Sequence, residues 1–172
     1  MELKGATFLY TLATLMITFA GFAALLLIVR QAAGAKLSAL DRFLTSTTIG
    51  HSLVLTGGAL LPMLLDLYGL PDALVWKVAA LVFGLPMLLL LLTYPHRRVV
   101  ATGSPPPPFV LAMFVVAGSL VLIAMMIDVL GNFGHGAAVY VTAVTVNFFL
   151  LAAAFVIAIE VVLRQPVSPG PK

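Results

Sequence analysis

The sequence contains no cysteine, and charged residues make up only 9% of it. The absence of cysteine excludes disulfides, thiolate metal sites and a cysteine nucleophile. The few basic residues do not form a stripe interleaved with aromatics, so nothing indicates nucleic acid as a partner. Catalytic motifs are missing too, because there is no nucleophile elbow, no phosphate-binding loop and no pair of carboxylates within an apolar segment. We therefore expect no enzyme, no cofactor and no bound metal.

Hydrophobic residues, by contrast, make up 62% of the chain, and the mean hydropathy is +1.18. A soluble domain of this size could not cover so much apolar surface in water. Roughly 20 apolar residues cross a bilayer core as a helix, and five segments of the sequence are at least about that long. The sequence predicts an all-α integral membrane protein, a single polytopic domain over 1–172. We expect a compact bundle of five transmembrane helices at about 6–29, 40–66, 73–93, 109–127 and 137–163.

The basic residues predict the orientation of this bundle. With five helices, seven of them fall at one end of the bundle, and only Lys4 and Lys77 fall at the other. Cytoplasmic ends carry the excess of Lys and Arg, so the prediction is N-out/C-in, with a cytoplasmic proline-rich loop at 94–108. The chain has the look of a small multi-pass bacterial membrane protein, so the expected location is a bacterial inner (plasma) membrane. The seven are Arg30, Lys36, Arg42, Arg97, Arg98, Arg164 and Lys172.

The predicted helix at 40–66 carries the most polar face of the chain. Its polar residues recur at spacings of four, three, four and four, which at roughly 100° per residue places them in one sector of the helix. A hydroxyl-lined face at membrane depth is typical of a conduit, but small and hydroxyl side chains also let helices pack closely and bond to each other. The face consists of Asp41, Thr45, Thr48, Ser52 and Thr56. Asp41 also follows Ser38 at the spacing of a helix N-cap.

His51 flanks that face near the middle of the helix. An ionisable side chain at membrane depth indicates a functional site, here a constriction or a protonatable gate. The alternative is a neutral imidazole hydrogen-bonded to a hydroxyl one turn away, such as that of Thr47.

A second hydroxyl stripe lies on the predicted helix at 6–29. It consists of Thr7, Thr11, Thr14 and Thr18, and Gly21 continues it. Because the link between the first two helices is short, they are expected to be antiparallel neighbours. The two stripes are expected to face each other across that pair, or else to line a pathway.

Three carboxylates, Asp66, Asp72 and Asp128, map to the non-cytoplasmic end. Together they could attract a cation at a vestibule, although wet helix ends are commonly acidic without any ligand.

Two functional hypotheses follow. The first is an oligomeric channel or conduit for ions or small polar solutes, with Thr45, Thr48, His51, Ser52 and Thr56 along the pathway. The second is an accessory or scaffold subunit of a larger membrane complex, whose polar faces only pack helices. Both take the lipid bilayer as a partner, together with further copies of the chain or other subunits.

Overall fold

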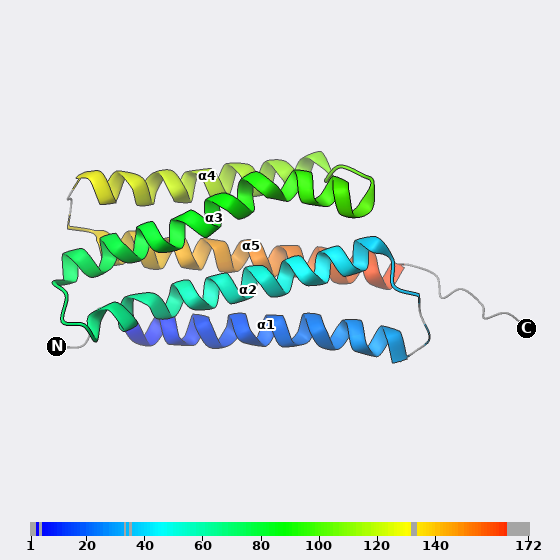
Figure 1. Ribbon diagram of the computed structural model, residues 1–172, viewed down its shortest axis with the longest axis horizontal. Coiled ribbons are helices and arrows are strands. Elements are labelled where there is room, and N and C mark those ends of the chain that lie inside the picture. Colours follow the sequence, from blue (N-terminus) through cyan, green and yellow to red (C-terminus); the bar gives the residue numbers. More distant parts are fainter. Residues whose placement is uncertain (1–2, 4, 33, 35, 132–133, 165–172) are drawn as a thin grey trace, which may run out of the picture.

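The computed structural model is all-helical, with five long helices that run up and down side by side (Figure 1). It describes residues 3, 5–32, 34, 36–131 and 134–164, without the side chains of 158 and 161–164. Lys4, Lys172 and the side chain of Arg164 thus lie outside the described residues. The helices are α1 (Ala6–Ala32), α2 (Ala39–Asp66), α3 (Asp72–Thr102), α4 (Pro108–Gly131) and α5 (Gly136–Arg164).

Each of these helices is long and apolar enough to cross a membrane. Each also points large apolar side chains away from the bundle, for example Leu25, Leu53, Leu89, Ile123 and Phe149. Apolar surface spread over every helix is unfavourable in water and favourable in lipid. The chain thus has the architecture of a multi-pass membrane protein.

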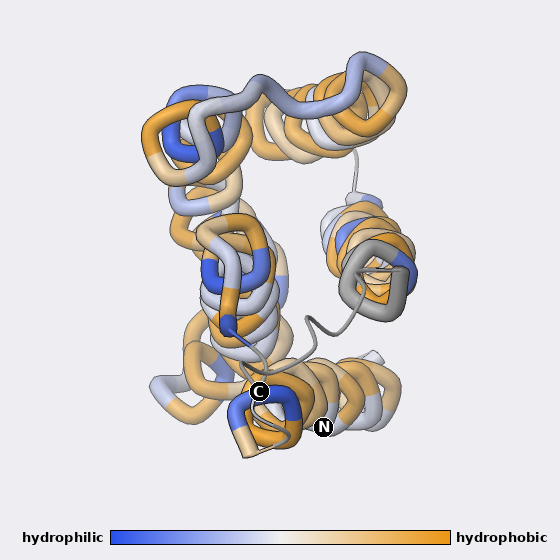
Figure 2. The backbone as a smooth tube through the Cα atoms, turned by 90° about the vertical axis from the view of Figure 1, so that its right-hand side faces the viewer, coloured by the Kyte–Doolittle hydropathy of each residue, from blue (hydrophilic) through white to orange (hydrophobic). Residues whose placement is uncertain are grey.

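The packing order follows the chain for four helices and then closes on itself. α1 packs on α2, α2 on α3 and α3 on α4, and α5 returns to pack against all four others. In the end-on view of Figure 2, α5 accordingly faces α2 across the bundle.

The helix at the predicted 73–93 is longer than expected, and the predicted loop at 94–108 is wrong over most of its length. α3 continues through Pro95 to Thr102, and only 103–107 connect it to α4. Near the end of the extension, Thr102 Oγ1 donates to the backbone carbonyl of Arg98, one turn back, at 2.9 Å. Gly103 then ends the helix with a φ of 71°, a left-handed conformation that glycine adopts without strain.

The start of α2 confirms the predicted N-cap. The Asp41 amide donates to Ser38 Oγ at 3.1 Å, and the Ser38 amide donates to Asp41 Oδ2 at 2.9 Å. This reciprocal capping box satisfies backbone donors that the first turn of a helix leaves free.

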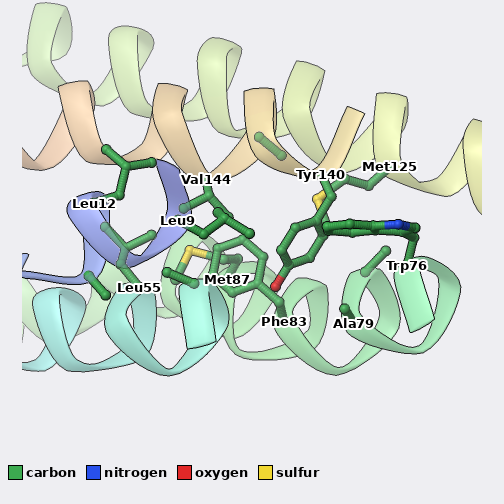
Figure 3. Close-up of a cluster of buried hydrophobic side chains, with 14 of the residues drawn as sticks. Leu9, Leu12, Leu55, Trp76, Ala79, Phe83, Met87, Met125, Tyr140 and Val144 are labelled. Carbon is green, nitrogen blue, oxygen red and sulfur yellow. The ribbon is translucent and has the colours of Figure 1, made fainter. Parts of the chain in front are cut away.

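Half of the bundle interior is solid. The buried side chains Leu9, Leu55, Phe83, Tyr140 and Val144 come from four helices and interlock there (Figure 3). The Tyr140 ring centroid lies 5.7 Å from those of both Trp76 and Phe83. These residues occupy the half of the bundle that contains the α2–α3 turn and the beginning of α5, opposite the end that carries Arg97.

Candidate functional site

The other half of the bundle is not completely filled by side chains. A cavity of about 150 Å³ lies between α2, α3, α4 and α5, large enough for several molecules the size of water. Its walls run from Leu40 to His51 on α2 and from Met87 to Arg98 on α3. At 1.5 Å per residue these walls are about 16 Å long, close to half of a bilayer core of about 30 Å. The cavity therefore reaches from the basic end of the bundle to its middle.

The inner end of the cavity is closed by the aromatic part of the core. Met87 belongs to both the cavity wall and the core. Phe83, one turn before Met87 in α3, belongs to the core. On α5 the wall ends at Asn147. The core residues Val144 and Tyr140 lie one and two turns before it in the chain. Tyr140 Oη donates to the Gly58 carbonyl at 2.6 Å, which ties α5 to α2 just beyond this end. A continuous pathway through the chain would require this block to move.

The cavity wall is mostly apolar, with polar groups at two levels. Tyr94, Arg97 and Arg98 lie at the basic end, and Thr47, Thr48, His51 and Asn147 lie deeper. Among its lining residues there is no carboxylate. Asn147 is buried and donates from Nδ2 to the Ala143 carbonyl at 2.9 Å, a bond within its own helix.

Three buried polar atoms of lining residues have no hydrogen-bond partner in the described part of the chain. They are Thr47 Oγ1, His51 Nε2 and Arg98 Nε. The predicted bond between His51 and Thr47 is therefore not formed through these atoms. Buried polar atoms are nearly always satisfied in folded proteins, and a cavity of this volume has room for the water molecules that would bond to these three.

The predicted polar face of α2 divides among three environments. Thr48 lines the main cavity, and Thr45 and Thr48 line a second cavity of about 30 Å³ against α1 and α5. Ser52 and Thr56 are buried away from both, with Thr56 Oγ1 donating to the Ser52 carbonyl at 2.8 Å. The five predicted pathway residues thus do not form one continuous lining, although Thr48 and His51 do lie at one cavity.

The helix-1 hydroxyl stripe does not face α2, contrary to expectation. Thr7, Thr11, Thr14 and Thr18 are all exposed on the outside of the bundle. Three of these hydroxyls donate to the carbonyl one turn back in α1, at 2.8 to 3.0 Å. Threonine satisfied in this way needs no partner helix, which is why its spacing alone did not determine where it points.

An ion pair between charged side chains joins α1 to α2. Arg30 Nη1 lies 2.9 Å from Asp41 Oδ2, and the Asp41 side chain is only 2% exposed. Sequence reasoning assigned Arg30 to the orientation and Asp41 to the helix cap. Arg30 and Asp41 carry opposite charges on the two sides of a short connection between antiparallel helices. That arrangement in the sequence could have predicted the ion pair.

The three carboxylates Asp66, Asp72 and Asp128 share the end of the bundle opposite Arg97, but they do not gather into a site. Asp72 is exposed, and Asp66 and Asp128 are half-buried. Within the described residues, no group of three or more His, Asp or Glu side chains could hold a metal ion. These positions fit wet helix ends.

No family model, no curated protein and no solved structure matches this chain. The cavity is therefore interpreted from its own geometry.

Proposed function

We propose that the protein is a non-enzymatic conduit that admits a solute from its basic end into the cavity beside α2, in a state closed at the far end. The cavity that joins the basic end to His51 supports this proposal. Thr48 and His51 line the solute's route, while Trp76, Phe83 and Tyr140 form the closed gate. The cavity crosses only about half of the membrane and is closed where α5 packs on α2. Opening of the pathway therefore requires α5 to move relative to α2.

We further propose that the basic end faces the cytoplasm of a bacterial inner membrane, which gives the N-out/C-in orientation. Arg30, Arg42, Arg97 and Arg98 lie at this end of the described bundle, against Lys77 at the other. Figure 2 looks onto the basic end, where hydrophilic segments gather on the helix ends. This asymmetry is the one that the positive-inside rule describes.

Labelling of single cysteines tests the access route, because the natural chain has no cysteine to interfere. Ala154 lines the cavity on α5, whereas Ala124 is exposed on the outside of α4 at membrane depth. We expect a water-soluble methanethiosulfonate reagent to modify Ala154→Cys from the basic side only. It should leave Ala124→Cys unmodified, since lipid excludes the reagent. An unreactive Ala154→Cys, in protein that labels normally once unfolded, would refute solute access.

Flux from reconstituted vesicles tests conduction. Wild-type protein should release at least one of potassium, chloride and acetate faster than empty vesicles do. Ala154→Phe should reduce this release by filling the cavity, and His51→Ala should alter it. Ala124→Phe, the matched control outside the cavity, should not change it. Absence of flux for all three solutes, with access intact, would leave a binding role without conduction.

A second candidate is an accessory subunit, and the outer face of α1 favours it. The exposed threonines Thr11, Thr14 and Thr18 are continued by Gly21, where an added Cβ would meet nothing within 4 Å. Small residues on a lipid-facing surface permit close approach of another helix, from a second copy or from another protein.

A further inference from the structure

We infer that the occupant of the main cavity is an amphiphile with one acidic head group, whose head binds at Arg97 and Arg98 and whose apolar body lies along the cavity toward His51. The inference rests on the proposed function only in that it uses the same cavity. It names the chemical class of the solute, which the access route alone does not determine.

The charge at the entrance selects an anion. Arg97 and Arg98 both line the cavity, and no carboxylate lies among the lining residues to neutralise them. Arg98 Nη1 donates to Tyr94 Oη at 3.4 Å, a long bond, while its Nε is buried without a partner among the described residues. A guanidinium presents several donors in a planar fork that matches a carboxylate or a phosphate.

The basic surface continues outside the entrance. An open groove between the beginning of α2 and the end of α3 is lined by Arg42, His96 and Arg97. Arg97 belongs to both the groove and the cavity. A head group at the entrance would therefore meet positive charge from two helices.

The walls beyond the entrance select an apolar body. Leucines from four helices contribute to them, among them Leu44, Leu90, Leu111 and Leu151. An inorganic ion would lose its water shell there, and too few polar groups line the walls to compensate for that loss of hydration. The wall length of about 16 Å is close to one leaflet of a bilayer core and matches an acyl chain from a membrane lipid or a fatty acid, whereas the volume of about 150 Å³, enough for a ligand the size of benzene, encloses only part of such a chain.

The inner polar atoms limit how far the apolar body extends. Thr47 Oγ1 and His51 Nε2 lie past the entrance without a hydrogen-bond partner in the described residues. An apolar chain in contact with these two atoms would leave them unsatisfied, so the chain ends short of them and water bonds to them at the inner end of the cavity. Neither atom supplies fixed negative charge, so neither opposes an anion.

Equilibrium binding of radiolabelled dodecanoate tests the inference, with the full chain in phosphatidylcholine nanodiscs. We expect saturable binding that dodecyl phosphate displaces and that dodecanol displaces at least tenfold less well. Equal displacement by dodecanol would overturn the acidic-head assignment. Displacement by phosphatidylglycerol would indicate a membrane lipid as the natural source, and displacement only by single-chain acids would indicate a free fatty acid.

Paired variants test the arginines. The double variant Arg97→Gln/Arg98→Gln should weaken dodecanoate binding at least tenfold, while Arg97→Lys/Arg98→Lys retains part of it and preserves the charge that orients the chain. Lys36→Gln removes a positive charge at the same end of the bundle but outside the cavity, and it should leave the affinity unchanged. Unchanged binding in the double glutamine variant would refute the inference.

The two proposals fail in different ways. Loss of dodecanoate binding in Ala154→Phe, but not in Ala124→Phe, would place the ligand in the cavity even if no solute crosses the membrane. Conversely, flux that Ala154→Phe blocks, without any preference for dodecanoate over dodecanol, would retain the conduit and remove the acidic amphiphile. A monodisperse elution profile and an unchanged melting temperature serve as the folding control for every variant.

Discussion

Tyr140 on α5 donates a hydrogen bond of 2.6 Å from its hydroxyl to the backbone carbonyl of Gly58 on α2, 82 residues earlier in the chain. Gly58 also lies close to the Phe83 ring of α3, which an added Cβ would meet. One tyrosine thus joins the helices that bound the cavity at the level where the cavity ends.

The Tyr140 hydroxyl should contribute to stability. Tyr140→Phe removes one buried hydrogen bond and leaves the ring in place, so we expect a loss of about 1 kcal/mol in the free energy of unfolding. Tyr68→Phe is the control, because Tyr68 is 76% exposed in the α2–α3 turn. Denaturant unfolding of both variants in the same detergent measures the difference, and equal stability of the two would contradict the assigned role.

Gly58 should not tolerate a side chain. An added Cβ would collide with the Phe83 ring, which is itself buried and therefore not free to move. We expect Gly58→Ala to destabilise the protein by roughly 1 to 3 kcal/mol, the range for overpacked cores. The neighbouring Gly57 has nothing within 4 Å of such a Cβ, so Gly57→Ala should be neutral or stabilising. Thermal unfolding of the two variants measures this difference in stability. Similar melting temperatures for Gly58→Ala and Gly57→Ala would refute the close α2–α3 packing.

The Arg30–Asp41 pair should couple α1 to α2. Asp41→Asn removes the charge and should cost about 2 kcal/mol, since it weakens both a charged hydrogen bond and the helix cap. Asp72→Asn, at an exposed position in the first turn of α3, should cost less than about 1 kcal/mol. A double-mutant cycle with Arg30→Gln isolates the coupling, and strictly additive losses would show that the two charges do not interact.

The outer threonines of α1 should be dispensable for folding. Thr14→Leu should change the free energy of unfolding by less than about 0.5 kcal/mol, because its hydroxyl serves only the α1 backbone. Thr93→Leu is a matched control, because Thr93 is also exposed and bonds the Leu89 carbonyl one turn back. Weaker self-association or loss of a co-purifying protein in Thr14→Leu alone would favour the accessory-subunit candidate. A large loss of stability would contradict the exposed position.

The orientation should be visible in cysteine labelling of the two sides. Ser104 lies exposed in the α3–α4 connection, and Tyr68 lies exposed in the α2–α3 turn at the opposite end. In intact cells, a membrane-impermeant maleimide should label Tyr68→Cys and leave Ser104→Cys unlabelled until the membrane is permeabilised. The reverse pattern would invert the proposed N-out/C-in orientation.

The sequence by itself determined the class of the protein and the number of helices. Long apolar segments separated by turn residues allow one interpretation only, because lipid admits no backbone that leaves its polar groups unsatisfied. The N-cap at Ser38 was predictable for a similar reason, since it depends on residues three positions apart. The end of α3 was not, because a proline at position 95 indicates a helix end locally, whereas the structure continues the helix past it.

Only the tertiary structure decided which polar residues face one another. The threonines of α1 and the polar face of α2 have nearly the same spacing, yet the first lies outside the bundle and the second inside it. In lipid both faces of a helix are apolar enough to be exposed, so hydrophobic periodicity no longer separates the inside from the outside. Packing of large side chains such as Tyr140 and Phe83 makes that choice. The same packing leaves a cavity in the other half of the bundle, between His51 and Arg98. No pattern along the sequence predicts that cavity.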